Sequence, residues 1–363
     1  MDAPVGVRIE GLSKRYSHRV KGEVYAARDV SIDVSPGEFL TLLGPSGCGK
    51  TTTLRMVAGF EKPDAGRVLF GGQDVTHTPA NARNIGFVFQ NYALFPHLSV
   101  AENVAYGLEV RAVPAADTAA RVAEVLKLVG LAGYEHQFSS QLSGGEQQRV
   151  ALARAIVIHP RVLLFDEPLS NLDAKLRVQM RQEIRDLQRR LGITTLYVTH
   201  DQEEAMAVSD RIVVMSKGVV RAQGTAQELY HRPRSEFVAQ FIGRVNLVPA
   251  RVIEAGGGRA RVEAMGATLE AAAPGGASPG DAVRLVLRPE AIEVVREGAG
   301  HWDAVVAERV FLGEKIEYRL RCGDAMLHIV RYNAGPGEAM DVGAAVRLRV
   351  VEGAASLLPK EDA

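Results

Sequence analysis

The sequence has little cysteine and no excess of charge of either sign. Its 363 residues include two cysteines, Cys48 and Cys322, which are too few for a disulfide framework and fit a reducing compartment. The 43 basic residues balance 43 acidic ones. Because proteins that bind nucleic acid usually carry a basic footprint, this balance argues against nucleic acid as the main partner. The composition thus excludes a small disulfide-stapled scaffold and gives no support to a nucleic-acid function.

Long hydrophobic runs are also absent. No stretch approaches the roughly 18 consecutive apolar residues of a membrane span. The densest candidate, residues 87–101, is interrupted by Gln90, Asn91, Pro96 and His97. The N-terminal residues MDAPVGVRIEGL show no basic-then-apolar signal pattern. We therefore expect a cytosolic protein that reaches a membrane only through a partner.

The chain is long enough for two domains, and its texture changes near Gly243. Before that point, short apolar runs alternate with helix-length segments, a pattern typical of a mostly parallel sheet covered by helices. The expected strands are residues 39–43, 85–89, 162–165, 194–199 and 212–215. The expected helices are residues 50–58, 121–131, 146–158, 174–191 and 202–209.

After Gly243, apolar and polar residues alternate with a period of two. Residues 316–321 and 346–350 are the clearest cases, and glycine-rich turns such as residues 256–258 separate the segments. Such alternation is typical of half-buried strands in an antiparallel sheet. We therefore expect a small all-β domain, either a barrel or a sandwich, behind the α/β domain.

The strongest motif is G-x-x-x-x-G-K-[ST], formed by Gly44, Pro45, Ser46, Gly47, Cys48, Gly49, Lys50 and Thr51. It follows an expected strand and opens an expected helix, the context in which this motif binds phosphate through backbone N–H groups. Lys50 would reach the β- and γ-phosphates, and the Thr51 hydroxyl would bind Mg²⁺. The alternative is a glycine-rich turn that binds nothing, and the complete motif in its context argues against it.

Two acids, Asp166 and Glu167, directly follow the expected strand 162–165. This position places them at the carboxyl edge of the sheet, where α/β proteins bind ligands. Asp166 is suited to hold Mg²⁺, and Glu167 is suited to deprotonate an attacking water. Taken alone, two such acids are more often the start of a solvated loop. Their occurrence beside a phosphate loop favours the catalytic interpretation.

A second helix start, Ser143-Gly144-Gly145-Glu146, also suits an anion, because its free N–H groups and helix dipole attract negative charge. Alone, it is equally well explained as an ordinary N-cap with a flexible entry. One chain thus has two phosphate-seeking helix starts and a single phosphate-loop lysine. Either the two converge within the chain, or they meet across the two-fold axis of a dimer.

These motifs, together with Gln90, residues 170–173 and His200, resemble the ABC-type ATPases over residues 6–241. The resemblance implies an ABC cassette of the P-loop NTPase fold. It also implies a homodimer in which each ATP lies between the phosphate loop of one chain and residues 143–146 of the other. The implied ATP-binding residues are Tyr16, Gly44, Pro45, Ser46, Gly47, Cys48, Gly49, Lys50, Thr51, Thr52 and Gln90. The residues implied to contact ATP from the partner chain are Ser143, Gly144, Gly145 and Glu146.

The same resemblance implies further roles. Gln90 would contact Mg²⁺ and the attacking water, and it begins a segment, residues 90–103, that senses the membrane partner. His200 would act as a switch at the γ-phosphate, catalytic together with Glu167 and Lys50. Asp173 would couple the two sites across the dimer. Tyr16 is the expected aromatic on adenine, with Tyr25 as the second candidate; either is otherwise a surface strand residue.

Without a membrane span, a transport role requires separate integral membrane permease subunits, and through them an extracytoplasmic solute-binding protein. The alternatives are non-transport ABC ATPases of DNA repair or translation. The repair type interrupts its cassette with a long coiled coil, and no sustained heptad pattern occurs here. The translation type carries two cassettes, and this chain has one phosphate loop. Neither explains residues 244–363.

Those C-terminal residues resemble the accessory OB-like barrel, of the TOBE type, found in one group of bacterial importer ATPases. The segment Val-Leu-Arg-Pro-Glu-Ala-Ile at residues 286–292 carries this likeness, and residues 89–96 and 199–205 support it. The group imports polyamines, ferric iron, maltose or sulfate, and the polyamine and ferric-iron types are closest. The resemblance implies a peripheral protein on the cytoplasmic face of the inner membrane. The solute does not contact this subunit in the family, so these residues do not determine it.

Overall fold

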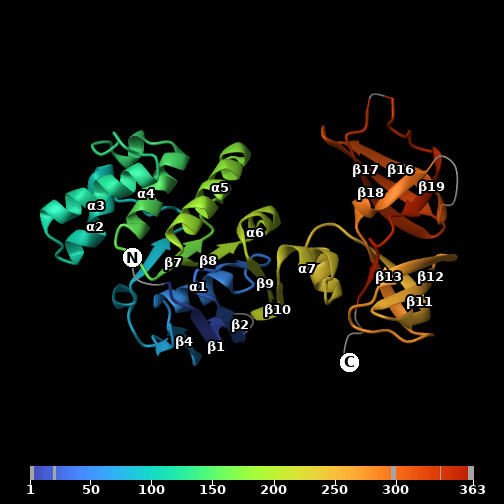
Figure 1. The fold of residues 1–363 in the computed structure, drawn as a ribbon, viewed down its shortest axis with the longest axis horizontal. Helices are drawn as coiled ribbons and strands as arrows, with labels where there is room; N and C mark the ends of the chain where they lie inside the picture. The colour runs from blue at the N-terminus through green and yellow to red at the C-terminus, as the bar shows by residue number, and fades with distance from the viewer. Residues whose placement is uncertain (1–3, 19–21, 296–299, 336, 359–363) are drawn as a thin grey trace. The chain divides into compact units, whose positions relative to one another are not determined.

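The computed structural model describes residues 4–18, 22–295, 300–335 and 337–358. The chain forms two compact units, residues 1–226 and residues 227–363. Figure 1 shows an α/β unit and a β-rich unit. In the part of the chain that the structure describes, no helix has the length and apolar character of a membrane span. The predicted domain limits, 6–241 and 244–363, differ from this division of the chain, and they remain a prediction.

The first unit is built on a six-stranded sheet with the order β10-β9-β3-β8-β7-β6. All neighbouring pairs are parallel except β9 with β10. The strands are β3 Phe39–Leu43, β6 Ile85–Val88, β7 Val162–Asp166, β8 Thr194–Thr199, β9 Arg211–Ser216 and β10 Val219–Gly224. Every residue of β3, β7 and β8 is buried, which explains their continuous apolar runs. The five expected strands are confirmed.

Helices cover this sheet: α1 Lys50–Ala58, α2 Val100–Val110, α3 Ala115–Leu128, α4 Gly144–Ile156, α5 Ala174–Leu191 and α6 Gln202–Val208. The predicted bounds of the helix at 121–131 were wrong. The helix begins earlier, at Ala115. The small side chains of residues 115–120 (AADTAA) are compatible with a helix, but they do not produce the apolar periodicity by which a helix is recognised. It ends earlier because Gly130, at φ 71°, closes the helix and the Leu131 N–H returns to the Leu126 carbonyl.

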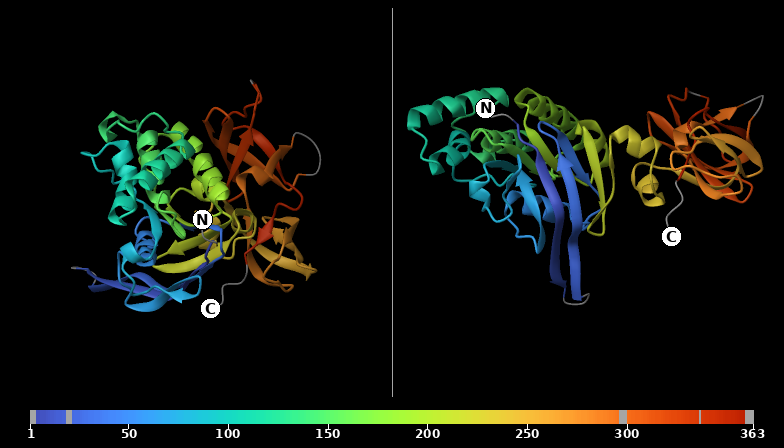
Figure 2. Two further views of the ribbon diagram at one scale, coloured as in Figure 1. Left: turned by 60° about the vertical axis from the view of Figure 1, so that its left-hand side comes forward. Right: turned by 60° about the horizontal axis from the view of Figure 1, so that its bottom comes forward.

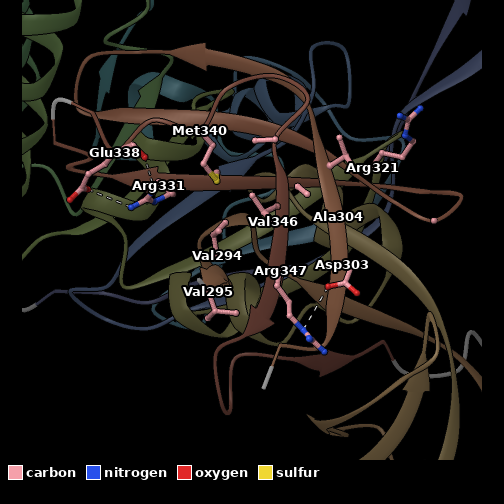
Figure 3. A pocket seen from close by; sticks show the side chains of 14 residues that line it. Val294, Val295, Asp303, Ala304, Arg321, Arg331, Glu338, Met340, Val346 and Arg347 are labelled. Carbon is pink, nitrogen blue, oxygen red and sulfur yellow. Dashed lines mark hydrogen bonds and ion pairs between the residues drawn. The ribbon is translucent and has the colours of Figure 1, made fainter. Parts of the chain in front are cut away.

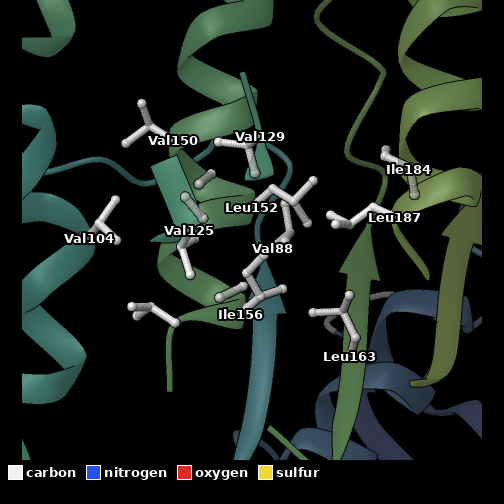
Figure 4. Close-up of a cluster of buried hydrophobic side chains, with 14 of the residues drawn as sticks. Val88, Val104, Val125, Val129, Val150, Leu152, Ile156, Leu163, Ile184 and Leu187 are labelled. Carbon is white, nitrogen blue, oxygen red and sulfur yellow. The ribbon is translucent and has the colours of Figure 1, made fainter. Parts of the chain in front are cut away.

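A buried apolar cluster holds α2, α3, α4 and α5 against the sheet (Figure 4). Each large aliphatic side chain in it contributes about 1.5–3 kcal/mol by leaving water. The cluster fixes α4 in particular, because α2, α3 and β6 all pack against it. Members labelled in Figure 4 are Val104, Val125, Val150, Leu152, Ile156, Leu163, Ile184 and Leu187.

Sequence reasoning missed a four-stranded antiparallel sheet with the order β2-β1-β4-β5. Its strands are β1 Val7–His18, β2 Gly22–Val34, β4 Ala65–Phe70 and β5 Gln73–Asp74. Register shifts interrupt the pairing of β1, and Gly11 in β1 lies at φ 59°. These bulges break the period-two alternation that identifies a strand. Val7, Ile9 and Leu12 of β1 share a core with Leu40 of β3 and Leu54 of α1.

Two short helices, α7 Ala226–His231 at the boundary and α8 Glu236–Phe241, precede the strands of the second unit. A closed barrel has the order β11-β12-β13-β20-β14, so the expected small all-β barrel is confirmed. A separate five-stranded sheet, β15-β19-β16-β17-β18, was not expected. The strands are β11 Asn246–Gly256, β12 Arg259–Ala264, β13 Ala267–Ala272, β14 Ala282–Leu287, β15 Ile292–Val295, β16 Trp302–Phe311, β17 Lys315–Cys322, β18 Ala325–Tyr332, β19 Ala345–Val350 and β20 Ser356–Leu357.

The barrel and the second sheet share one core. The Trp302 indole on β16 is buried and donates a hydrogen bond of 3.1 Å to the Ala264 carbonyl on β12. A cavity of about 1090 Å³ lies on the second sheet (Figure 3). Two of the arginines that line it face acids, Arg331 with Glu338 and Arg347 with Asp303. Further views of both units are given in Figure 2.

A buried arginine attaches α7 and α8 to the barrel. The Arg288 guanidinium donates hydrogen bonds to the carbonyls of Tyr230, Ala239 and Arg244. It also lies over the Tyr230 ring, 4.0 Å from the ring centroid. Because all three carbonyls belong to the segment before the barrel, this one side chain orders that segment.

Replacing Arg288 by lysine removes the fork of donors while keeping the charge. We expect Arg288→Lys to lower the local opening free energy of α8 by about 2–4 kcal/mol, since buried carbonyls lose their partners. Hydrogen exchange of the full chain, read at α8, measures this. Arg284→Lys, which alters an exposed ion pair with Glu236, is the control and should change protection by less than about 1 kcal/mol. Equal exchange in the two variants contradicts the assignment.

Candidate active site

The predicted site residues gather at one edge of the six-stranded sheet. Strands β3, β8 and β7 are adjacent and parallel, so their carboxyl ends meet. β3 continues into the loop that begins at Gly44, β8 into His200, and β7 ends at Asp166 before Glu167. The register sets Asp166 beside Val198. This edge is where open α/β sheets bind ligands.

Glycine is required where other backbone crosses the loop between β3 and α1. A Cβ on Gly49 would lie 1.9 Å from the Ala26 carbonyl oxygen, and Gly49 has a φ of 103°. A Cβ on Gly44 would lie 2.3 Å from the Met215 carbonyl oxygen. The loop is therefore held between the end of β9 and residues of β2, and its shape does not tolerate larger side chains at these two positions.

Lys50, the first residue of α1, is buried at 4% exposure. Its ammonium donates to the carbonyls of Gly44 at 2.8 Å and Pro45 at 3.2 Å, and Nζ lies 3.9 Å from the Cys48 Sγ. These partners are all neutral, so the arrangement leaves a positive charge available to an anion in the loop. Burial raises the pKa of the Cys48 thiol, which disfavours its reactive thiolate form.

Thr51 and Asp166 form a pair of oxygen ligands. The Thr51 hydroxyl donates to Asp166 Oδ1 at 2.9 Å. Burial raises the pKa of Asp166 above its usual range, although the Thr51 hydrogen bond and the charges of Arg55 and Lys50 oppose this shift. In the described residues, no group of three His, Cys, Asp or Glu side chains can enclose a metal. One carboxylate and one hydroxyl fit Mg²⁺, which keeps waters and substrate phosphates as its other ligands.

Glu167 and His200, predicted as base and switch, are in contact. The Glu167 Oε2 lies 3.0 Å from the His200 Nδ1. The Glu167 N–H donates to the Val198 carbonyl at 3.0 Å, and the Ser170 hydroxyl donates to the Glu167 carbonyl at 2.9 Å. Glu167 adopts a φ of 46°, a strained conformation for this residue type. Strain of this kind is characteristic of functional positions.

Ser143 caps α4 in a capping box. The Glu146 Oε2 accepts from both the N–H and the hydroxyl of Ser143 at 2.7 Å, and these bonds lower the pKa of Glu146. Gly144 and Gly145 let α4 approach its neighbours, since a Cβ on Gly145 would lie 3.0 Å from the Leu176 side chain. Within the described residues, no hydrogen bond or ion pair joins residues 143–146 to residues 44–52.

Gln90 and Asp173 lie in two segments that are joined by a hydrogen bond. The Asn171 side chain donates to the Gln90 carbonyl at 2.9 Å. Asp173 is the N-cap of α5 and accepts from the Leu176 N–H at 2.9 Å. The Gln90 side chain itself is exposed beyond the end of β6.

The two candidate tyrosines both present exposed rings. Tyr16 lies on β1, where Lys14 Nζ is 5.6 Å from its ring centroid. Partial burial raises the pKa of its phenol, and the Thr52 side chain opposes this shift as a hydrogen-bond partner. Tyr16 is thus beside α1, the helix that follows the loop. Tyr25 lies on β2 with two guanidinium groups 5.8 Å from its ring.

Sequence reasoning missed Arg154, which links α4 to the segment after β6. Its guanidinium donates to the carbonyls of Tyr92 and Ala93 at 2.7 Å and lies 5.6 Å from the Phe95 ring centroid. Both carbonyl residues have positive φ values, which no sequence pattern indicated. Asn103 was missed as well. It is buried and bonds the backbone of residues 95–99 four times; a polar residue early in an apolar helix was its only signal.

Comparison with known proteins identifies the family. The ABC transporter family model matches residues 27–170, and the TOBE domain model matches residues 285–358. The Fe(3+) ions import ATP-binding protein FbpC of Brucella abortus is 49% identical over 327 residues, 90% of this chain and 91% of that protein. The chain belongs to the ATP-binding subunits of ABC importers. It is an ATPase that energises solute import, as the resemblance implied.

Two further relatives extend the comparison. The spermidine/putrescine import ATP-binding protein PotA of Rubrobacter xylanophilus is 48% identical over 347 residues, 94% of this chain and 91% of that protein. A dimeric structure of the ATP-binding cassette MJ0796, bound to ADP and Pi, matches with a TM-score of 0.54 and 32% identity. It covers 60% of this chain and 98% of that cassette. The comparisons favour import over the repair and translation alternatives.

The loop geometry leads to a matched pair of substitutions. We expect Gly49→Ala to destroy nucleotide binding and to destabilise the first unit by more than about 3 kcal/mol, because the new Cβ meets the Ala26 carbonyl. Gly47→Ala meets no atom within 4 Å, although Gly47 has a φ of 75°, and should cost only about 1 kcal/mol. Thermal unfolding and binding of a fluorescent ATP analogue measure both. Similar losses for the two variants contradict this account.

Proposed function

We propose that residues 44–52 of this importer subunit hold the phosphates of ATP and that the contact between Glu167 and His200 is the hydrolytic centre. The observation that carries the proposal is this 3.0 Å contact at the sheet edge where the phosphate loop begins. Lys50, Ser46 and the backbone N–H groups of the loop neutralise the phosphate charge. Lys50 supports this role because its present partners are neutral carbonyls.

Thr51, Asp166 and Gln90 would hold Mg²⁺ with the bound nucleotide. When bound, Mg²⁺ neutralises charge on the phosphates and fixes their geometry. The hydrogen bond between Thr51 and Asp166 supports the assignment of these two residues, since it sets two hard oxygen ligands side by side. Gln90 is assigned from the family resemblance, and the Asn171 bond to its carbonyl positions its backbone.

Hydrolysis follows from the position of Glu167. Its carboxylate accepts a proton from the attacking water, and the imidazole of His200 holds the carboxylate in place and reaches toward the γ-phosphate. Lys50 stabilises the negative charge that the phosphate oxygens carry in the transition state. Tyr16 stacks on adenine, which its exposed ring beside α1 supports.

Two chains act together in the proposed cycle. Ser143, Gly144, Gly145 and Glu146 of one protomer contact the ATP held by its partner, and Asp173 couples the two sites. The dimeric MJ0796 structure supports this arrangement. ATP closes the dimer because both half-sites bind it, and its hydrolysis removes the shared ligand.

The membrane partner docks on the segment after β6 and on α2. Val110 is 70% exposed and Tyr106 is 43% exposed, and the Tyr106 ring lies 4.7 Å from that of Phe95. Arg154 connects this surface to α4 and so to Ser143. The partners are integral membrane permease subunits, which in turn meet an extracytoplasmic solute-binding protein. The subunit is thus peripheral, on the cytoplasmic face of the inner membrane.

The imported solute is proposed to be ferric iron, with polyamines as the second candidate. Support comes from relatives named for each cargo, at 49% and 48% identity over most of this chain. The second proposed domain, residues 244–363, acts as a TOBE-type accessory domain to the ATPase domain, residues 6–241.

The base assignment has a direct test. Glu167→Gln should reduce ATP hydrolysis by at least about a hundredfold, because the amide cannot accept the proton of water. It should leave ATP binding intact and accumulate an ATP-bound dimer. Phosphate release, nucleotide binding and size-exclusion chromatography measure these properties. Glu203→Gln, at an exposed position of the nearby helix α6, is the control and should retain hydrolysis. Retained hydrolysis in Glu167→Gln removes Glu167 as the base.

The transport assignment is tested in the native organism. Tagged Glu167→Gln protein with MgATP should capture membrane permease subunits from native membranes, identified by mass spectrometry. Cells lacking this chain should lose uptake of labelled Fe³⁺ and keep uptake of labelled spermidine. The opposite pattern makes the cargo a polyamine. Capture of ribosomes or DNA-repair proteins in place of membrane subunits contradicts the partners proposed here.

A further inference from the structure

A cavity of about 310 Å³ lies in the first unit, away from the sheet edge that carries the proposed nucleotide site. Three elements meet around it: α3, the residues at the end of α4, and the end of α5 with the residue before β8. Its wall is apolar and continues the buried cluster of Figure 4, where Val125 and Ile156 are drawn. The apolar lining residues are Val125, Leu128, Ile156, Pro160, Leu191 and Ile193.

The rim of this cavity is charged. Lys127 in the last turn of α3 and Arg190 in the last turn of α5 are both exposed. In the described residues, neither has an ion pair with an acid. Glu124 is the one carboxylate among the lining residues. The lining therefore offers two cations against one acid, with the imidazole of His159 beside them, and it complements a ligand with a single negative charge.

The volume limits the size of the ligand. At about 30 Å³ per water-sized group, the cavity accepts roughly ten non-hydrogen atoms. A medium-chain carboxylate such as octanoate has about that size. Its chain would contribute about 0.8 kcal/mol per buried CH₂, and its carboxylate would reach the rim cations. A full lipid is too large for this space.

The cavity lies at the far ends of elements that carry the proposed nucleotide residues. α4 has Ser143 as its N-cap, and its last residue, Ile156, lines the cavity. β8 begins directly after Ile193, which also lines it, and leads at its other end into His200. α5 follows Asp173 and ends at Leu191. A shift of any of these elements changes both places.

We propose that this cavity binds a small amphipathic monocarboxylate and that its occupancy is coupled to nucleotide binding through α4, α5 and β8. The proposal that the cavity binds a carboxylate is based on the cavity and the charged residues at its rim. The coupling half rests on the nucleotide site proposed above. Coupling of this kind is reciprocal, so the nucleotide and the carboxylate change each other's affinity by the same factor.

Isothermal titration calorimetry of the full chain with octanoate tests the binding half. Wild-type protein should bind octanoate, and octanol, which lacks the carboxylate, should bind about tenfold more weakly. The double variant Lys127→Gln/Arg190→Gln should lose about tenfold in octanoate affinity. The control Arg121→Gln/Arg189→Gln makes the same charge change on the same two helices outside the lining and should bind as wild type. Absence of binding to wild type, or equal affinity in the two double variants, overturns the proposal.

A filled cavity gives an independent readout. Leu128→Trp puts a large ring into the space from a partly buried position and should abolish octanoate binding while circular dichroism stays unchanged. Retained binding in a folded Leu128→Trp protein places the ligand elsewhere. Should this variant not fold, the charge variants decide the question alone.

The coupling half is tested by repeating the titration with a saturating non-hydrolysable ATP analogue and Mg²⁺. The affinity for octanoate should change by at least about twofold, and octanoate should change the affinity for a fluorescent ATP analogue by the same factor. If the analogue binds and neither affinity changes, the coupling is overturned. If the analogue does not bind at all, the nucleotide site proposed above fails, and octanoate binding is judged separately.

Discussion

The parallel pairing of β7 with β8, and of β8 with β3, is the constraint on which the rest of the site depends. Backbone hydrogen bonds fix Asp166 beside Val198, so the residues after both strands emerge together. The Glu167 N–H extends this ladder by one bond to the Val198 carbonyl. Because the strands are buried on both faces, a one-residue slip is prevented by the packing of every side chain. The contact between Glu167 and His200 is thus a consequence of strand register.

Helix α4 connects three parts of the molecule. Ser143 caps its N-terminus, Arg154 in its last turn binds the backbone of Tyr92 and Ala93, and its last residue, Ile156, lines the small cavity. The apolar cluster of Figure 4 makes it a rigid body, since protein interiors are packed too densely to deform gradually. Displacement at one of these places is therefore felt at the other two.

The fold could be predicted wherever one physical rule acted alone. Buried parallel strands can be recognised as continuous apolar runs. The motif at residues 44–51 can be recognised because it lies between an expected strand and an expected helix. The bulged strand β1 could not be found, because shifts in register destroy alternation. Arg154 and Asn171 could not be assigned either. Their partners are backbone carbonyls. Every residue type has a backbone carbonyl, so the sequence does not indicate which ones accept these hydrogen bonds.

The candidate site divides in the same way. The sequence was enough to predict Lys50, Thr51, Asp166, Glu167 and His200 as site residues. Their residue types and their positions after expected strands can be read from it directly. It could not state that Lys50 bends back onto the carbonyls of its own loop, or that Glu146 binds the Ser143 hydroxyl. Both contacts depend on three-dimensional geometry that several distant segments set together.

The left-handed backbone of Glu167 bears on how this enzyme can be improved or degraded by mutation. Glycine or asparagine at this position would relieve a strain of about 1 kcal/mol or more and yield a more stable protein. Selection for stability alone therefore favours the loss of the carboxylate. At the position of the proposed base, stability and turnover therefore make opposite demands on one side chain.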